Sequence, residues 1–301
     1  MDKVIVITGP TGIGKTDLSL KIAEKFNGEI INADASQFKK DLNIGTAKID
    51  LNSTVIKHHL INNIEATEMF SISDYQKESR KIITDIINHD KLPIFVGGSG
   101  LYINACLNEY NLDSPKRSDK LDEKYERLNN EELHSILVGL DYNASLSIHP
   151  NNRKRVLRAI ELAESGNSIS SNTDGNKPVY DYLIICLNTD REVLYNRINM
   201  RCDIMLKNGW IEECSNLKKS GIDISKIKDI GYSDIFDYLE HGNITYDDLK
   251  EVIAKKTRNY AKRQITWMKN KMSSVFVDMD YDNIQNTIDK VENLINEFLN
   301  K

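Results

Sequence analysis

The sequence GPTGIGKT, residues 9–16, lies between a short apolar run, Val4–Ile7, and a stretch whose apolar residues recur at helical spacing. It satisfies the pattern G-x-x-x-x-G-K-[ST] in the strand, loop and helix context that this pattern requires. Glycines let the backbone curl so that several N–H groups point inward, and the N-terminus of the following helix adds positive partial charge. The segment predicts a site for a di- or triphosphate, but it identifies neither the bound molecule nor a phosphoryl transfer. The predicted phosphate-binding residues are Gly9, Pro10, Thr11, Gly12, Ile13, Gly14, Lys15, which supplies a positive charge, and Thr16, whose hydroxyl can bind Mg²⁺.

The segments that follow this loop are expected to alternate between helix and strand. Residues 29–33, 92–96 and 182–187 are apolar runs that we interpret as buried strands. Residues 71–90 carry isoleucines at helical spacing, with Ser73 as a candidate N-cap. Because this alternation is typical of a parallel sheet, the sequence predicts an α/β fold with a P-loop NTPase-like parallel sheet core. After residue 187 we expect a long helical stretch.

The pattern changes near residue 114, and no convincing strand occurs from there to about residue 178. Apolar residues at helical spacing predict three helices in this interval, the first of them around Leu121. The polar tract 168–177 is interpreted as a loop. We therefore expect an all-helical insertion domain, residues 114–178, within a core that comprises residues 1–113 and 179–301.

Composition indicates a soluble globular protein of 301 residues, with 40% hydrophobic and 28% charged residues. No apolar stretch approaches the roughly 20 residues that a membrane span needs, and the N-terminus has no signal-peptide pattern. The four cysteines form no CxxC pair, so we expect reduced, buried thiols and neither a disulfide framework nor a zinc site. These features together predict a cytoplasmic protein.

Charge is unevenly distributed along the chain, whose formal net charge is −5. Residues 255–271 carry seven Lys and Arg, residues 149–160 carry four, and neither segment contains an acid. The other 29 basic residues stand against all 45 acidic ones. Two basic segments in an acidic body are either an electrostatic footprint for a polyanion or two solvated helix faces, and charge alone leaves both interpretations open.

Two polar residues follow predicted strands at the edge where ligands bind in open α/β sheets. Asp34 is placed to accept a proton from a nucleophile, but it is equally suited to cap a helix or to lie near bound Mg²⁺. Ser99 is placed for a hydrogen bond to a phosphate or a leaving oxygen, and the alternative is a plain turn serine. The residue pattern does not choose between these roles.

These residues belong to an ordered set of motifs that resembles the tRNA dimethylallyltransferases, also called tRNA isopentenyltransferases. The phosphate loop alone is shared with many unrelated proteins, whereas the ordered set is far more specific. The resemblance is carried by residues 9–16 (GPTGIGKT), 34–48 (DASQFKKDLNIGTAK), 58–60 (HHL), 96–102 (VGGSGLY), 149–161 (HPNNRKRVLRAIE), 230–232 (IGY) and 261–267 (AKRQITW).

The resemblance implies transfer of a dimethylallyl group from dimethylallyl diphosphate to N6 of adenine 37 in tRNAs that read codons beginning with U. By this resemblance Lys15 and Thr16 would neutralise the diphosphate, Thr16 through Mg²⁺, and Asp34 would be the general base. Ser99 stands where the family usually has Thr. Arg197 and Arg201 match residues that clamp the diphosphate, and their spacing puts them on one face if the segment is helical.

The resemblance also implies contacts with the tRNA anticodon stem-loop, which the helical insertion and the core would hold together. Tyr232 and Trp267 are open between RNA contact and core packing, and we favour a structural role for His58 and His59, because adjacent strand residues face opposite ways. No membrane contact is expected, and nothing demands more than a monomer. The residues that match tRNA-contacting segments are Asp34, Ala35, Ser36, Gln37, Ser99, Lys154, Arg155, Arg158, Gly231, Tyr232, Lys262, Arg263 and Gln264.

Two other functions remain open at this point. The first is a P-loop small-molecule or nucleotide kinase, which would leave the basic segments without an obvious use. The second is a catalytically weakened tRNA-binding homologue, because Ala35, Lys39 and Asn62 stand where the family usually has Ser, Tyr and Asp. Retention of the predicted catalytic residues favours the enzyme; these are Lys15, Thr16, Asp34, Ser99, Arg197 and Arg201.

Overall fold

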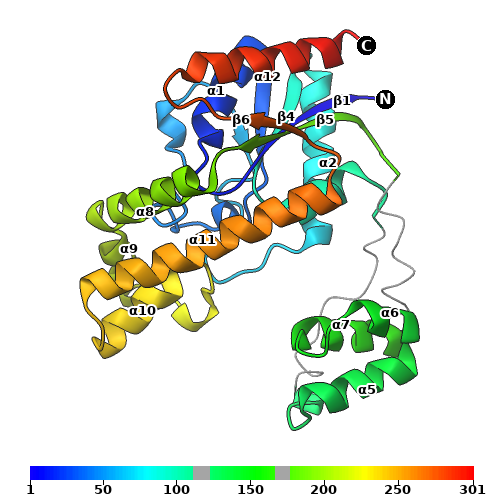
Figure 1. Cartoon of the computed structure of the whole chain (residues 1–301), viewed down its shortest axis with the longest axis vertical. Helices are drawn as coiled ribbons and strands as arrows, with labels where there is room; N and C mark the ends of the chain where they lie inside the picture. Colours follow the sequence, from blue (N-terminus) through cyan, green and yellow to red (C-terminus); the bar gives the residue numbers. More distant parts are fainter. Residues whose placement is uncertain (111–122, 167–176) are drawn as a thin grey trace. The chain divides into compact units, whose positions relative to one another are not determined.

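The computed structural model describes residues 1–110, 123–166 and 177–301. The chain forms two compact units, Met1–Leu107 with Tyr180–Lys301, and Asn108–Val179 (Figure 1). The expected insertion start at residue 114, Leu121 of the first predicted insertion helix and nearly all of the loop at 168–177 lie outside the described residues. Of the rest of that predicted helix, which included Tyr125 and Leu128, Glu123 and Lys124 are helical and residues 125–127 form a turn.

The larger unit is built on a six-stranded sheet in which every pair of neighbours is parallel, which confirms the predicted α/β fold. The strand order is β3-β2-β4-β1-β5-β6, so the strand that leads into GPTGIGKT lies inside the sheet. Its residues Val4–Ile7 are fully buried, as expected for a strand covered on both faces. The strands are β1 (Lys3–Thr8), β2 (Gly28–Asn32), β3 (His58–His59), β4 (Leu92–Gly97), β5 (Asp181–Asn188) and β6 (Val275–Asp278).

The edge strand β6 corrects the expectation of helix alone after residue 187. It has only four residues, and Val275 and Phe276 are each 40% exposed, so it lacks the continuous apolar run of a buried strand. It pairs with β5, to which Met279 also donates a backbone hydrogen bond at the Asn188 carbonyl, 2.8 Å away. A short half-exposed edge strand is recognised by its pairing rather than by its composition.

Helices cover the sheet and extend beyond its carboxyl edge (Figure 1). The N-cap of α2 is Ser71 and not Ser73, because the Ser71 hydroxyl accepts a hydrogen bond from the Asp74 N–H at 3.1 Å. The helices of this unit are α1 (Lys15–Lys25), α2 (Ile72–Asn88), α3 (Gly100–Leu107), α8 (Arg191–Lys207), α9 (Trp210–Lys219), α10 (Tyr232–His241), α11 (Tyr246–Lys271) and α12 (Ile284–Leu299), with short 3₁₀ turns at Ala35–Phe38, Leu51–Ser53 and Ile224–Lys226.

The smaller unit contains three helices within its described residues, α5 (Asn130–Leu140), α6 (Tyr142–Ser147) and α7 (Arg153–Glu164). Asn129 begins α5 with a capping box that it forms with Glu132. Apolar side chains of the three helices pack into a core of their own. The six-residue α6 was not predicted, since so short a helix shows little periodicity. The core residues are Leu133, Leu137, Ala144, Ile148, Val156, Leu157, Ala159 and Ile160.

The cysteine prediction is confirmed: Cys106, Cys186, Cys202 and Cys214 are all buried free thiols. Among the described helices, none combines the length and apolar character that crossing a membrane would require.

Candidate active site

The GPTGIGKT loop connects β1 to α1 and borders a cavity of about 480 Å³. Gly14 begins α1 with φ 104° and no side-chain cap, a left-handed conformation that glycine adopts without strain. The first N–H groups of α1 are therefore left for an anion, as the sequence predicted for a phosphate site. The wall of this phosphate cavity includes Lys15, Thr16, Asp34, Arg197 and Arg201.

Lys15 is tied to the loop itself. Its Nζ donates to the carbonyls of Gly9 and Pro10 at 3.0 and 2.9 Å. Burial lowers the pKa of Lys15 to about 8, although the charge of Asp34 opposes this shift. A phosphate group beside Lys15 would supply the negative charge that the buried ammonium lacks.

Asp34 lies just past the end of β2, at the carboxyl edge of the sheet. Its Oδ1 accepts the Ser36 N–H at 3.2 Å, so the helix-cap interpretation is confirmed for the 3₁₀ turn that begins at Ala35. The Asn32 side chain accepts from the Asp34 N–H at 3.0 Å and donates to the Asp34 carbonyl at 3.1 Å, which holds the backbone in place. Burial raises the pKa of Asp34, and the charges of Lys15 and Arg201 only partly counter it. A raised pKa makes this carboxylate a better proton acceptor.

A second cavity, of about 320 Å³, meets the phosphate cavity at Asp34 and Arg201. We call it the aromatic cavity, because Trp210, Tyr232 and Tyr260 line it. Arg201 comes from α8, where Arg197 lies one turn earlier and also lines the phosphate cavity, so the prediction that they share a helix face is confirmed. A molecule held in either cavity can reach the same carboxylate.

Trp210 forms much of the aromatic wall and is 1% exposed. A Cβ added at Gly45 or at Gly231 would lie 2.1 Å from its ring, so both glycines are needed for the indole to fit. The Tyr232 ring meets the indole edge at a centroid distance of 5.5 Å. One glycine from each of two motifs, IGTAK and IGY, therefore leaves the space that the Trp210 ring occupies.

Tyr232 is packed in the core, which was one of its two alternatives, but it also lines the aromatic cavity, so its contact with RNA stays a prediction. Its side chain is fully buried, its hydroxyl donates to Glu213 Oε1 at 2.6 Å, and it accepts the Gly45 N–H at 3.2 Å. Glu213 also accepts the Ile44 N–H at 2.9 Å. This network holds the turn that contributes Gly45 and Thr46 to the aromatic cavity.

Gln264 is also buried, with its side chain only 5% exposed. It accepts the Thr11 N–H at 2.9 Å and donates to the Gly98 carbonyl at 3.1 Å, which joins the phosphate loop to the loop after β4. Both ends of its amide are bound inside the protein, so Gln264 supports the phosphate loop, and its contact with RNA stays a prediction.

Ser99 and Tyr260 support the turn at Asp34. The Ser99 hydroxyl accepts the Ala35 N–H at 3.3 Å, and Tyr260 hydrogen-bonds with the side chains of Ser99 and Gln264. Burial raises the pKa of Tyr260 to about 12, with a further contribution from the charge of Asp34. Sequence reasoning missed Tyr260; its position one helical turn before Gln264 on α11 is the only signal for it.

The remaining predicted RNA contacts fall into two groups. Ala35, Ser36 and Gln37 lie in the half-buried turn after Asp34, where Gln37 Nε2 donates to the Thr46 carbonyl at 3.1 Å. Lys262 and Arg263 are exposed on α11, and Arg263 also lines the aromatic cavity. On α7, Lys154 and Arg155 are exposed, whereas Arg158 pairs with Glu161 at 2.5 Å.

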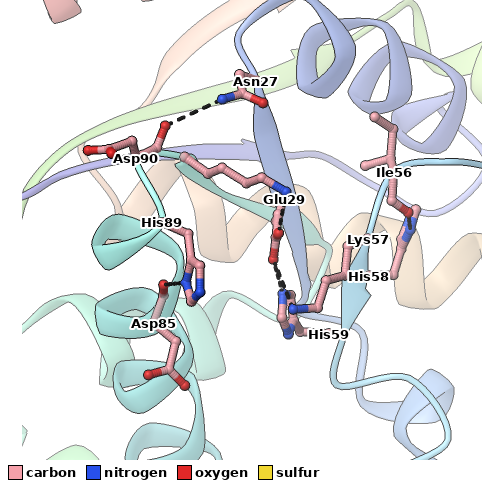
Figure 2. Close-up of polar contacts among 10 residues, drawn as sticks. Asn27, Glu29, Ile56, Lys57, His58, His59, Asp85, His89 and Asp90 are labelled. Carbon is pink, nitrogen blue, oxygen red and sulfur yellow. Dashed lines mark hydrogen bonds and ion pairs between the residues drawn. The ribbon is translucent and has the colours of Figure 1, made fainter.

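Trp267 packs against Gly100 of α3, and His58 and His59 each lie within hydrogen-bond distance of a protein group. Trp267 is half-buried against Gly100, where an added Cβ would lie 2.2 Å from the indole. His59 Nε2 donates to Glu29 Oε2 at 2.6 Å beside the first residues of β2 (Figure 2). His58 Nδ1 lies 2.8 Å from the Ile56 carbonyl.

No group of three or more His, Cys, Asp or Glu side chains in the described ranges could hold a metal ion. Mg²⁺ bound with substrate phosphates needs few protein ligands, because phosphate oxygens and water complete its octahedron. The Thr16 hydroxyl lines the phosphate cavity and fits that requirement.

Fold and site together define a P-loop α/β enzyme in which the phosphate cavity and the aromatic cavity share one carboxylate, that of Asp34. A model of the IPP transferase family matches residues 37–271, which is most of the chain. The chain belongs to the tRNA dimethylallyltransferase (IPP transferase) family.

Relatives and solved structures agree with this assignment. A tRNA dimethylallyltransferase of Clostridioides difficile (strain 630) is 41% identical over 295 residues, which cover 93% of both chains. One from Bacillus velezensis is 40% identical, over 92% of this chain and 90% of the relative. The crystal structure of a tRNA isopentenylpyrophosphate transferase from Staphylococcus epidermidis matches with TM-score 0.73 and 38% identity, over 99% of both chains. A eukaryotic dimethylallyltransferase acting on tRNA matches with TM-score 0.82 and 29% identity, over 99% of this chain and 80% of that one.

Proposed function

We propose that this protein transfers the dimethylallyl group of dimethylallyl diphosphate to N6 of adenine 37 in tRNAs that read codons beginning with U. The observation that carries the proposal is the junction of the phosphate and aromatic cavities at Asp34 and Arg201. The donor's diphosphate suits the first cavity and a purine base suits the second. Family membership supports this reaction class.

In this reaction the N6–C1 bond forms and the bond between C1 and the diphosphate oxygen breaks. The electron pair of the broken bond leaves with the diphosphate, and the N6 proton passes to the Asp34 carboxylate. An exocyclic amine is a poor nucleophile, so both the base and charge stabilisation on the leaving group are needed. Asp34 suits the role of base because its backbone is held on both sides and burial raises its pKa.

The leaving diphosphate would be held by the N-terminus of α1, Lys15, Arg197 and Arg201. Lys15 and Arg201 also carry their charges close enough to Asp34 to affect its pKa, so the leaving group and the base would be acted on together. Mg²⁺, when bound through the Thr16 hydroxyl and the diphosphate oxygens, would supply further positive charge.

The RNA would have to present an unstacked adenine, which costs a few kcal/mol. Arg263 lines the aromatic cavity and Lys262 is exposed beside it, so α11 offers positive charge to the phosphates around that adenine. We infer that the helical unit adds contacts with the anticodon stem-loop through Lys154 and Arg155.

The test is mass spectrometry of an anticodon stem-loop whose anticodon ends in A and is followed by adenine. The RNA is incubated with the protein, Mg²⁺ and dimethylallyl diphosphate, without ATP. We expect a mass gain of one dimethylallyl group that Asp34→Ala abolishes while RNA affinity is retained. RNA binding without any mass gain would favour a weakened tRNA-binding homologue, and ATP turnover without RNA binding would favour a kinase.

A further inference from the structure

The segment between β6 and α12 lies against the phosphate loop, and no motif in the sequence marks it. Its Asp280 is anchored from α12, since the Asp280 N–H donates to the buried Thr287 hydroxyl at 2.8 Å. A Cβ added at Gly14 would contact Met279 at 3.4 Å, so this segment packs directly on the loop. Tyr281 follows at the point where the segment reaches Ile13 and Arg197.

Tyr281 contacts the loop and Arg197, and its hydroxyl also hydrogen-bonds with the Thr189 side chain. Its hydroxyl donates to the Ile13 carbonyl at 3.0 Å. Its ring lies 4.1 Å from the guanidinium carbon of Arg197. Planar guanidinium groups stack on aromatic faces, and at this distance the attraction includes a cation–π term.

The stacked guanidinium is also bound at one edge. Arg197 Nε donates to the Gly12 carbonyl at 3.1 Å. In the described part of the chain, no protein acceptor takes a hydrogen bond from its two terminal nitrogens, and Arg197 lines the phosphate cavity. The ring therefore sets the plane of a guanidinium whose remaining donors are available to an anion in that cavity.

We propose that Tyr281 is a positioning residue that holds Arg197 and the Gly12–Ile13 carbonyls of the loop in the arrangement that binds the donor's diphosphate. This inference rests on the proposed function, in which Arg197 binds that diphosphate. Tyr281 does not touch the reacting atoms, so its removal should act through Arg197: donor binding should weaken and RNA binding should stay unchanged.

The experiment compares Tyr281→Leu, which removes the ring face, with Tyr281→Phe, which keeps the ring and loses only the hydroxyl. We expect Tyr281→Leu to raise KM for dimethylallyl diphosphate by about two- to thirtyfold, with KM for RNA within twofold. The Kd of inorganic diphosphate with Mg²⁺, measured by calorimetry, should rise by the same factor. Tyr281→Phe should recover most of the affinity.

Tyr195 provides the matched control, because its ring also contacts arginines, Arg191 at 5.1 Å and Arg258 at 5.9 Å, but Tyr195 is not among the residues that line the phosphate cavity. Tyr195→Leu should leave both constants unchanged. If Tyr281→Leu instead lowers kcat with unchanged donor KM, or if Tyr195→Leu has the same effect as Tyr281→Leu, Tyr281 only supports the fold and the proposal is wrong.

Arg197 variants separate this inference from the proposed function. Arg197→Lys keeps the charge but loses the planar guanidinium, so it should weaken the binding of inorganic diphosphate at least as much as Tyr281→Leu does. This test does not depend on the folding of the Tyr281 variant. In an Arg197→Ala background, Tyr281→Leu should have no further effect on diphosphate binding. Unchanged diphosphate affinity in Arg197→Ala itself would instead overturn the assigned role of Arg197, and this inference with it.

Discussion

Strand β2 carries one carboxylate near its start and leads to another just past its end, and their pKa values move in opposite directions. Burial alone would raise the pKa of Glu29, but hydrogen bonds from Lys91 and His59 and the charge of Lys57 lower it to about 2. Figure 2 shows the hydrogen bond between Glu29 and His59. At Asp34 burial prevails and the pKa is raised, although Lys15 and Arg201 counter it.

The difference lies in where the cations are placed. Lys91 and His59 contact Glu29 at 2.8 and 2.6 Å, so its charge is satisfied inside the protein. Asp34 accepts a backbone N–H through Oδ1, and the nearby cations line a cavity instead of pairing with it. A paired carboxylate stabilises the fold, whereas a carboxylate left without a close cation is free to take a proton.

The largest expected effect is on kcat, which should fall when Asp34 is neutralised but not when Glu29 is. Asp34→Asn keeps the Oδ1 acceptor for the Ser36 N–H but removes the base, so kcat should fall by about 10²- to 10⁴-fold. Glu29→Gln should leave kcat within twofold. Both are measured by single-turnover prenylation of a stem-loop RNA. A loss of activity in Glu29→Gln comparable to that in Asp34→Asn would contradict the comparison.

The pH profile of kcat/KM should report Asp34 and Lys15. The base must be deprotonated, so activity should rise with pH through an apparent pKa above the ordinary Asp value of about 3.9. Activity should fall again near pH 8, because the pKa of Lys15 is lowered to about 8 in the free enzyme. Glu29→Gln should shift neither the rise nor the fall of this pH profile. A rise in activity centred at or below pH 4 would contradict the raised pKa of Asp34.

Stability should change in opposite directions in the same two variants. The lowered pKa of Glu29 means that its contribution is present above its unfolded pKa of about 4.3 and is lost as pH falls toward 2. Glu29→Gln should therefore lower the free energy of unfolding at pH 7 by about 1–3 kcal/mol. Asp34→Asn removes a charge that burial disfavours, so it should stabilise by about 0.5–2 kcal/mol. Urea denaturation measures the free energy of unfolding of both variants. A lower value for Asp34→Asn than for the unchanged protein would contradict the expected stabilisation.

The smallest expected effect concerns Lys57. Its Nζ is 3.5 Å from Glu29 Oε2, and its side chain is 65% exposed. Solvent screens such a contact, so Lys57→Ala should change the free energy of unfolding by less than about 0.5 kcal/mol. A loss as large as that in Glu29→Gln would mean that exposed charge, rather than the closer Lys91 and His59 contacts, stabilises this end of β2.

Local sequence patterns were sufficient to predict much of the secondary structure and the placement of some candidate site residues. The strand before the phosphate loop, the helix after it and the shared face of Arg197 and Arg201 depend on neighbours in sequence, and the structure has them as expected. The error at Ser71 is a shift of two residues within a correctly expected helix. Strand β6 was missed because it is recognisable only from its pairing with β5.

Two side chains are more deeply buried than their motifs suggested, and the physical cause is the same for both. Tyr232 and Gln264 stand in motifs that resemble RNA-contacting segments, yet both are buried. Their hydrogen-bond partners, Gly45 and Thr11, are 187 and 253 residues away in the chain. No spacing rule reports such partners, so polar residues that join distant segments look like surface residues in the sequence.

By itself, then, the sequence determined a phosphate-binding loop on a parallel α/β sheet, a family, and the type of residue that would act as base, because these follow from short-range backbone geometry and from residue order. Only the tertiary structure decided that Asp34 lies where two cavities meet, that Trp210 fits between Gly45 and Gly231, and that Tyr281 stacks on Arg197. These properties depend on burial and on contacts between residues far apart in the chain, which arise only when the chain is packed.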